Sequence, residues 1–328
     1  MKHKVSVAPM MDCTDRHDRY FLRLISKNVM LYSEMIATKS AIHGDRNKIL
    51  SFSPEEKPLA LQVGGSDKKE LSKVAKIAEE MNYDEININL GCPSKKVQKN
   101  KFGACLMKEP DLVAECINEM INSCNIPVTA KTRIGFDDTE NFNYLNNFIL
   151  KMKDAGCKKF ILHARKAILK GLSPKQNLNI PKLNYEMVYK IKKENPGLEI
   201  IINGGISKIE EIKKHLQFCD GVMIGRSIYQ NPFFLVDIEK EIFKVKSNPS
   251  REEIVEKLLK YLEKEVKLGT KVNHIMRHTV GLYHGQVGSK KWKRYLSDNM
   301  MARDSDFQKA KHIMAIVQNN EKFNESNT

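Results

Sequence analysis

The sequence lacks any segment that would take the chain into or across a membrane. Its 328 residues hold no uninterrupted apolar run near the ~18 residues that a bilayer-crossing helix needs. The first apolar run, VSVAPMM, is too short for the hydrophobic segment of a secretory signal and fits a first β-strand better. We therefore expect a cytoplasmic protein with no membrane partner.

Regularly spaced cysteines are also missing. The seven cysteines are an odd number, and no two show the Cys-x-x-Cys spacing of metal and cluster sites. A disulfide framework, a zinc site and a ferredoxin-type iron–sulfur cluster are therefore not expected. Reduced thiols fit a cytoplasmic location, and we assign no residue as a metal ligand.

A third absence is local, because residues 271–297 contain neither Asp nor Glu. The whole chain carries 55 Lys and Arg against 40 Asp and Glu, a net charge of +15. The acid-free segment places six cations among His, Tyr and Trp rings, a pattern typical of nucleic-acid contact. The alternative is a solvated helix face whose rings turn inward, with the excess charge reflecting composition and solubility.

Short apolar, β-branched runs alternate with longer amphipathic stretches as far as residue 243. Eight strands alternating with helices imply a parallel sheet. The pattern predicts an α/β protein with a closed (β/α)8 TIM barrel, and an open parallel sheet is the alternative. The predicted strands are 5–10, 31–35, 59–65, 85–91, 128–135, 159–165, 199–206 and 220–226.

The composition changes at residues 244–250, KVKSNPS, a charged and Pro-containing linker. No strand pattern follows it. Helical patterns begin at Arg251, His274, Ser289 and Phe307, and four helices of this length predict a small bundle. We therefore expect a catalytic TIM-barrel domain at 1–243 and a small C-terminal helical domain at 244–328.

Polar residues and glycines end six successive predicted strands, at the barrel edge where (β/α)8 enzymes carry their chemistry. Asn203-Gly204-Gly205 and Gly225-Arg226 end the last two strands and predict a phosphate site, because glycine lets backbone N–H groups approach phosphate oxygens. A tight turn is the plain alternative for each glycine. Lys131 and His163 would then lie beside the ring of a phosphate-bearing cofactor, such as a flavin.

Cys92 is the strongest single candidate for chemistry. It follows a predicted strand end and precedes a proline, and a thiol with an ordinary pKa is mostly protonated near pH 7 and can act as a general acid. Cys105 is the second candidate for this acid and Cys13 a weaker one. We expect Cys116, Cys124, Cys157 and Cys219 to be small buried apolar residues.

The sequence resembles the tRNA-dihydrouridine synthases, and within them the A subgroup. The stretch GCPSKKVQKNKFGA at 91–104 is highly specific for this family, and HARKAILKGLSPKQN at 163–177 points to the A subgroup. Further matches, among them APMMDCTDRHDRYFLRL, INGGI, DGVMIGRSIYQNP and RHTVGLYHGQVGSKKWKRYLS, follow in order from near residue 5 to near residue 297.

The resemblance implies an FMN-dependent reduction of uridine to 5,6-dihydrouridine in the tRNA D-loop, at positions 20 and 20a, with NADPH reducing the flavin. Hydride would add to C6 of the uracil, and Cys92 would donate the proton to C5 from the other face. The target base would have to leave its stack to reach the barrel mouth. The helical domain would bind tRNA, and we expect a monomer.

The resemblance also assigns residues, position by position. The family pattern places FMN against Pro9, Met10, Met11, Gln62, Lys131, His163, Asn203, Gly204, Gly205, Gly225 and Arg226. Our candidates for tRNA contact are Asn89, Lys175, Arg277, Lys290, Lys293 and Arg294.

Two other functions remain open at this point. One is a flavin barrel acting on a free small molecule such as a dihydropyrimidine, which would share the phosphate site and the cysteine but would not need the basic helical tail. The other is a tRNA-binding module without catalysis, which the full set of ring-side and phosphate-side residues disfavours.

Overall fold

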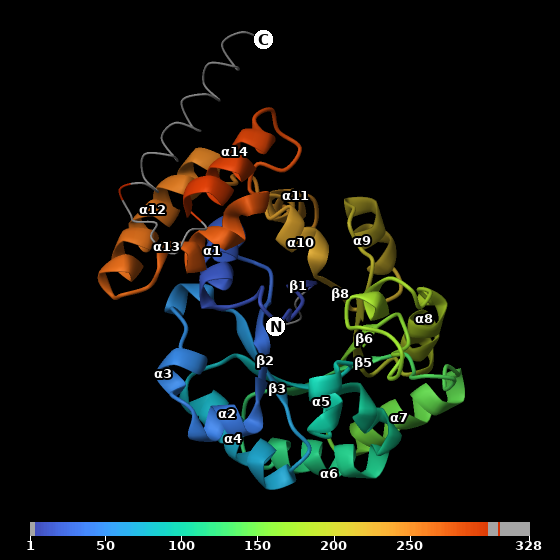
Figure 1. The fold of residues 1–328 in the computed structure, drawn as a ribbon. Coiled ribbons are helices and arrows are strands. Elements are labelled where there is room, and N and C mark those ends of the chain that lie inside the picture. The colour runs from blue at the N-terminus through green and yellow to red at the C-terminus, as the bar shows by residue number, and fades with distance from the viewer. Residues whose placement is uncertain (1–3, 301–307, 309–328) are drawn as a thin grey trace. The chain divides into compact units, whose positions relative to one another are not determined.

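The computed structural model describes residues 4–300 and residue 308 (Figure 1). The fourth predicted helix, which begins at Phe307, lies outside these residues except for residue 308. Contacts divide the chain into two units. Residues up to Asp12 and Val29–Gly225 form one, called the barrel unit below; Cys13–Asn28 and the chain from Arg226 onward form the other, the helical unit.

The barrel unit is a TIM barrel of eight parallel strands. The strands pair in the order β1-β8-β7-β6-β5-β4-β3-β2. Backbone hydrogen bonds from Val7 N to Met30 O (2.9 Å) and from Met30 N to Val5 O (3.1 Å) join β1 to the residue before β2, so the ring nearly closes. The closed barrel is thus confirmed over the open sheet. The strands are β1 (Val5–Val7), β2 (Leu31–Ala37), β3 (Leu59–Gly64), β4 (Glu85–Leu90), β5 (Val128–Arg133), β6 (Lys159–His163), β7 (Glu199–Asn203) and β8 (Gly221–Ile224).

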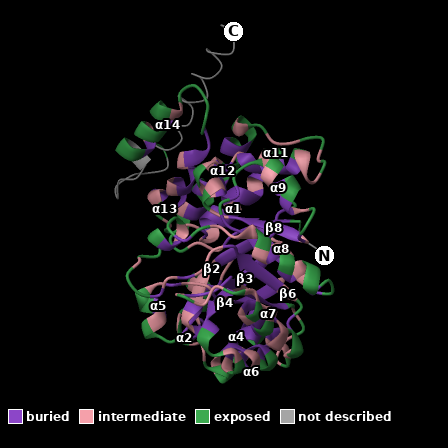
Figure 2. Ribbon diagram, turned by 90° about the vertical axis from the view of Figure 1, so that its right-hand side faces the viewer, coloured by how far each residue is buried: buried purple, intermediate pink, exposed green. Residues whose placement is uncertain are grey.

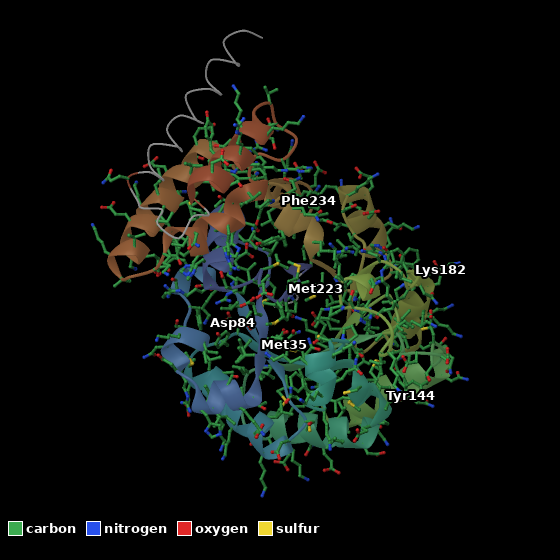
Figure 3. All side chains as sticks on the ribbon, in the orientation of Figure 1. Met35, Asp84, Tyr144, Lys182, Met223 and Phe234 are labelled. Carbon is green, nitrogen blue, oxygen red and sulfur yellow. The ribbon has the colours of Figure 1, made fainter. Side chains whose placement is uncertain are left out.

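The strands form because their apolar, β-branched residues are buried on both faces, as a parallel barrel requires. Figure 2 shows the strands as the buried centre of this unit, while its helices keep exposed outer faces. One cluster inside the ring joins Tyr32 of β2, Ile161 of β6 and Met223 of β8, all less than 2% exposed. Figure 3 shows Met223 within the ring and Tyr144 and Lys182 towards its rim.

The helices of the barrel unit follow local signals in the sequence. Asp67 accepts a hydrogen bond from Glu70 N at 2.9 Å and caps α4, as predicted. Pro110 begins α6, and Asn141 caps α7 through Tyr144 N at 2.8 Å. The elements are α2 (Thr38–His43), α3 (Arg46–Ile49), η1 (Pro54–Glu56), α4 (Lys68–Glu80), α5 (Lys95–Lys99), η2 (Gly103–Lys108), α6 (Pro110–Ile121), α7 (Phe142–Asp154), η3 (Gln176–Leu178), α8 (Tyr185–Glu194) and α9 (Ile209–His215).

The helical unit combines an early helix with the C-terminal ones. Its elements are α1 (Arg16–Ile25), α10 (Arg226–Gln230), α11 (Phe234–Glu241), α12 (Arg251–Lys267), α13 (Val272–Met276), η4 (Arg277–Gly281), α14 (Ser289–Tyr295) and η5 (Leu296–Met300). Figure 1 shows α1, in blue, beside α12 and α13, in orange. Tyr20 of α1 stacks on Tyr261 of α12 with ring centroids 3.8 Å apart.

The helical unit therefore gathers residues that lie on both sides of the predicted domain boundary at 243/244. The contact division describes packing, and the assignment of functional domains at 1–243 and 244–328 stays a prediction. Within residues 4–300, none of the helices is long and apolar enough to cross a membrane.

Candidate active site

Cys92 lies on the loop between β4 and α5, where it is half-buried and held through its backbone. Asn89 Oδ1 accepts hydrogen bonds from the backbone N–H groups of Gly91 (3.1 Å) and Cys92 (2.9 Å). Ala104 N donates to the Cys92 carbonyl at 2.9 Å. Gly103 permits this approach, since its φ is +77° and a Cβ there would lie 2.6 Å from Cys92 O. The thiol therefore stands on a backbone that is fixed from both sides.

The Cys92 thiol is protonated at neutral pH. Burial raises its pKa above the ordinary value of 9.0, and the nearby charges of Arg133 and Lys131 offset part of that rise. A protonated thiol suits a proton donor rather than a nucleophile. Cys105 also has a pKa raised by burial, and its Sγ donates to Phe102 O at 3.2 Å. Cys92 differs from Cys105 in lying beside the two strand-end cations.

The remaining cysteines mostly fill space. Cys116, Cys157 and Cys219 are buried, as predicted, and burial raises the pKa of each to about 12. Cys124 is only half-buried, so the prediction of a buried residue is wrong there. Cys13 is half-buried and belongs to the helical unit.

Lys131, on β5, is held by an asparagine from β7. Its Nζ donates to Asn203 Oδ1 at 3.1 Å, and Asn203 Nδ2 donates to the Met223 carbonyl at 2.8 Å. Because that carbonyl can only accept, the Asn203 oxygen must face the lysine. Burial, together with the nearby charge of Arg133, lowers the pKa of Lys131 from 10.5 to about 7. An anionic group bound here would relieve this cost.

The end of β7 forms a tight cradle against His163. Gly204 has φ +123°, and a Cβ added to it would lie 2.8 Å from His163 Cδ2. Gly205 has φ +73°, and its Cβ would lie 2.7 Å from Leu183 Cδ1. Tyr185 OH donates to the Gly204 carbonyl at 2.7 Å. Both positions therefore require glycine for two reasons: their φ is positive, and a Cβ would collide with His163 or Leu183. A turn exposed to solvent would give only the first reason.

The ends of β8 and β1 also meet. A Cβ on Gly225 would lie 3.3 Å from Met10 Sδ, so Met10 lies against the end of β8. Pro9 and Met10 are half-buried, whereas Met11 is 54% exposed. Arg226 is the first residue of α10 and belongs to the helical unit.

Gln62 is almost completely buried, at 1% exposure, and both ends of its amide are bonded inside the barrel. Its Oε1 accepts from Asn89 Nδ2 at 2.9 Å, and its Nε2 donates to Asn87 Oδ1 at 2.8 Å. The predicted cofactor residue Gln62 and the predicted tRNA residue Asn89 are therefore direct neighbours, and Asn89 also holds the Cys92 loop.

Arg133 joins the Cys92 loop to the long segment after β6. Its Nε donates to the Gly91 carbonyl at 3.0 Å, and its Nη1 donates to the carbonyls of Lys166 (3.1 Å) and Asn177 (3.0 Å). Burial lowers the pKa of Arg133 to about 10, so it stays charged at neutral pH. A charged guanidinium fixed by three carbonyls is a rigid clamp.

Asn177 and Gln98 hold the same segment from within. Asn177 is fully buried and bonds Ile168 through both amide atoms, with Oδ1 accepting from the N–H at 2.7 Å and Nδ2 donating to the carbonyl at 2.9 Å. Gln98 Nε2 donates to the carbonyls of Pro93 (2.8 Å) and Leu169 (2.9 Å). The long loop at 166–183 is thus tied to the Cys92 loop at several points.

No sequence pattern predicted a role for Arg133, Gln98 or Asn177. The signal was present, since Gln98 and Asn177 lie inside the two motif stretches quoted above. A side chain that shapes a loop through backbone carbonyls has no sequence pattern of its own.

The basic candidates are exposed, with one exception. Lys175 is exposed on the loop after β6, and Lys290, Lys293 and Arg294 are exposed on α14. Arg277 is half-buried and pairs with Asp15 within the helical unit.

Some rings of residues 271–297 turn inward, as a solvated helix face predicts, and others are exposed, as nucleic-acid contact predicts. Trp292, Tyr283 and His278 are each at most 1% exposed, so they pack inside the helical unit and are not available for stacking. Trp292 Nε1 donates to the Thr279 carbonyl at 2.9 Å. His284 is exposed. The charges of α14 are therefore accessible while its tryptophan is core.

Comparison with known proteins agrees with this geometry. The sequence profile described as "Dihydrouridine synthase (Dus)" matches residues 6–320. The chain belongs to the dihydrouridine synthase family.

Relatives within the family are similar along most of their length. A Shewanella oneidensis protein named "tRNA-dihydrouridine(20/20a) synthase" is 50% identical over 295 residues, 90% of this chain and 88% of the relative. Proteins of the same name from a Synechocystis species and Escherichia coli strain K12 are 50% and 48% identical, over 90% and 96% of this chain and 89% and 91% of theirs.

As a dihydrouridine synthase family member, the chain places a protonated thiol, a buried lysine and a glycine-lined cradle at one end of its barrel. This arrangement can hold an anionic, planar group and deliver a proton next to it.

Proposed function

We propose that this protein is a flavin-dependent tRNA-dihydrouridine synthase that reduces uridine to 5,6-dihydrouridine at positions 20 and 20a of the tRNA D-loop. Family membership and the names of its relatives support the reaction. The observation that carries the proposal is the protonated Cys92 thiol on a rigid loop beside Lys131 and Arg133. A free dihydropyrimidine would not need the exposed cations of α14.

The residues present fit FMN. Gly204 lets the backbone approach His163 closely, since a Cβ there would lie 2.8 Å from His163 Cδ2, and the lowered pKa of Lys131 indicates a site that favours an anion. The proposed FMN residues are Pro9, Met10, Met11, Gln62, Lys131, His163, Asn203, Gly204, Gly205, Gly225 and Arg226. When bound and reduced by NADPH, the flavin would supply the hydride that adds to C6 of the uracil.

The protein's own part in the reaction is proton delivery. Cys92 Sγ holds a proton at neutral pH and would donate it to C5, leaving a thiolate that Lys131 and Arg133 stabilise by charge. The Asn89 and Ala104 contacts fix the Cys92 backbone from which the thiol extends.

For tRNA contact we propose Asn89, Lys175, Arg277, Lys290, Lys293 and Arg294. The exposed cations among them suit phosphate contacts, which give affinity without sequence information. We further propose a cytoplasmic monomer. All seven cysteines are free thiols, which fits that compartment.

The first prediction tests the thiol. Cys92→Ala should keep bound flavin and the oxidation of NADPH but lose dihydrouridine formation by about a hundredfold or more, because general acid catalysis contributes that much. Dihydrouridine is mapped in unmodified tRNA after incubation with NADPH, with free uridine as a second substrate.

Cys105→Ala is the matched control and should retain activity. Normal dihydrouridine formation by Cys92→Ala together with a loss in Cys105→Ala would transfer the role to Cys105. Equal turnover of free uridine and tRNA would favour a small-molecule enzyme.

A further inference from the structure

A line of five hydrogen bonds runs through the barrel interior and ends at the backbone of Cys92. Thr129 Oγ1 donates to Glu85 Oε1 at 2.7 Å, and Asn87 Nδ2 donates to Thr129 Oγ1 at 2.8 Å. The remaining links are Gln62 Nε2 to Asn87 Oδ1 (2.8 Å), Asn89 Nδ2 to Gln62 Oε1 (2.9 Å) and Cys92 N to Asn89 Oδ1 (2.9 Å). The five side chains that make these bonds are called the amide chain below. In order they are Glu85, Thr129, Asn87, Gln62 and Asn89.

Strand geometry places the amide chain. Glu85, Asn87 and Asn89 alternate along β4, so they lie on one face of the strand. Gln62 pairs in register with Asn87 from β3, and Thr129 pairs with Asn87 from β5. The first four links therefore cross between neighbouring strands that are already held by backbone bonds, and the fifth joins Asn89 to the loop that follows β4.

The amide chain is shielded from water. Asn87 is fully buried, Gln62 and Thr129 are 1% exposed and Glu85 is 4% exposed, whereas Asn89 is half-buried at the strand end. Hydrogen bonds in such surroundings are stronger than in water, and those in a line polarise one another. Breaking one link leaves buried polar atoms without a partner, which is costly.

The Glu85 carboxylate forces the direction of every link. A carboxylate only accepts, so the single hydroxyl hydrogen of Thr129 must point to Glu85. The Thr129 oxygen must then accept, which turns the NH2 group of Asn87 towards it. The same reasoning passes from Asn87 to Gln62 and leaves the oxygen of Asn89 facing Cys92.

Glu85 itself is anchored as the charged acceptor. Lys159 Nζ contacts its Oε2 at 2.8 Å, and Tyr32 OH donates to its Oε1 at 2.6 Å. Burial and the charge of Glu85 raise the pKa of Tyr32, so the phenol keeps its proton and remains a donor.

We propose that Glu85 and Thr129 are positioning residues for the proton donor, because the carboxylate at one end of the amide chain orients Asn89 at the other and so fixes the Cys92 loop. A reversed chain would present Asn89 Nδ2 to the N–H groups of Gly91 and Cys92, where donor would face donor. The loop would then have to move. The proposal rests on the proposed function only for the role of Cys92.

The test breaks the chain at its one hydroxyl. Thr129→Val removes the link while keeping the shape of the side chain, and Thr129→Ser restores it. Thr132→Val is the matched control, since Thr132 is also buried on β5 but its hydroxyl reaches only the carbonyls of Leu90 (3.4 Å) and Arg133 (3.3 Å). Glu85→Gln is the second variant, because its amide can bond Thr129 in the reversed direction without a change in size.

The first measurement is hydrogen exchange of the Gly91 and Cys92 amides in the purified full-length protein. Thr129→Val and Glu85→Gln should speed this exchange by about fivefold or more, the factor expected for one lost hydrogen bond. Thr129→Ser and Thr132→Val should match the wild type. A structural role alone would lower the unfolding temperature without changing exchange at these two amides.

The second measurement separates kcat from KM. In Thr129→Val, kcat for dihydrouridine formation should fall by about tenfold or more, since a small misplacement of a catalytic group has that effect. The KM for tRNA should change much less than kcat, because Asn89 is the only proposed tRNA residue in the amide chain and the exposed cations of α14 lie outside it. Wild-type exchange and kcat in both Thr129→Val and Glu85→Gln would overturn the proposal. If the wild type forms no dihydrouridine, the proposed function fails while the exchange measurement still tests the positioning.

Discussion

Lys131 and Gly204 show how single residues prepare the barrel mouth for an anionic ring. Burial makes it costly to protonate the amine of Lys131, and its pKa is therefore lowered to about 7. Gly204 lets the backbone pack closely against His163, because a Cβ there would lie 2.8 Å from His163 Cδ2. The desolvated amine of Lys131 is a local cost in the free protein, and strongly shifted pKa values of this kind are typical of functional sites.

The second prediction concerns Gly204. Gly204→Ala places a Cβ 2.8 Å from His163 Cδ2 at φ +123°, so it should lower the free energy of unfolding by about 1 kcal/mol or more and reduce bound flavin. Urea unfolding and the flavin absorbance per protein chain measure the two effects.

Gly197→Ala is the control for this substitution. Nothing lies within 4 Å of a Cβ there, so the variant should keep wild-type flavin content. Full flavin occupancy in Gly204→Ala would contradict the cradle.

The loop at 166–183 acts as one element because a few buried polar side chains organise it. Asn177 holds the backbone at Ile168 through both of its amide atoms. Arg133 joins the loop to Gly91, the residue after β4. Long loops that are tied down in this way are commonly part of a functional site.

The third prediction concerns this loop. Asn177→Ala removes the bonds to Ile168 and should expose the chain at Lys166, Lys170 and Lys175 to trypsin, with lower dihydrouridine formation and an intact barrel. Timed digestion followed by mass spectrometry identifies the cleaved bonds. Ile180→Ala, which changes a side chain that is 58% exposed on the same loop, should digest like the wild type. Equal resistance of both variants would show that Asn177 does not hold the loop.

Helix α14 is the second element to which a function is assigned. Its lysines and arginine are exposed while Trp292 is buried, so charge rather than stacking would carry any RNA contact.

The fourth prediction follows from that charge. Lys290, Lys293 and Arg294 changed together to Ala should weaken tRNA binding and flatten its dependence on salt, because fewer counterions are released from the tRNA. Binding is measured across a series of salt concentrations. Lys69, Lys73 and Lys76 of α4, also exposed, give a control triple of equal charge. An equal salt slope in both triples would make the α14 cations a solvated surface.

At the scale of the whole molecule, the helical unit depends on a helix that the chain forms before β2. Asp15 caps α1 through His17 N (2.9 Å) and also pairs with Arg277 and His278, so early and late segments share one charged cluster. The desolvation of His17 lowers its pKa to about 4. Hydrogen bonds and charges from His278 and Arg277 hold the pKa of Asp15 well below its ordinary value, against the effect of burial.

The fifth prediction is a loss of stability of this unit in mild acid. Between pH 6.5 and about 4 the unfolded chain binds a proton at His17 that the folded unit does not, so the free energy of unfolding falls as the pH falls, by up to about 3 kcal/mol. The single tryptophan, Trp292, is buried in the helical unit, and its fluorescence reports unfolding there. His17→Gln should remove this part of the pH dependence. An unchanged pH profile in His17→Gln would show that His17 is not responsible.

Much of the barrel and its candidate site could be predicted from the order of residues. Alternating apolar runs predict eight parallel strands, and the polar ends of those strands mark the mouth because parallel strands bring their ends to one edge. Gly204 and Gly205 both have positive φ, which the alternative of a tight turn also explains, so their role in binding phosphate stays a prediction. The tRNA residues, the FMN residues and the functional domain boundary stay predictions.

What the sequence determines by itself is therefore local: strand periodicity, helix caps such as Asp67, and the residue types available at each strand end. Only the tertiary structure decides which of these side chains meet. It buries Trp292 and Tyr283, which were candidates for stacking, and places α1 with the C-terminal helices. It also connects Glu85 to Cys92 through four other side chains from three strands. The physical reason is that burial and hydrogen-bond partners depend on contacts between residues distant in the chain, which no local pattern encodes.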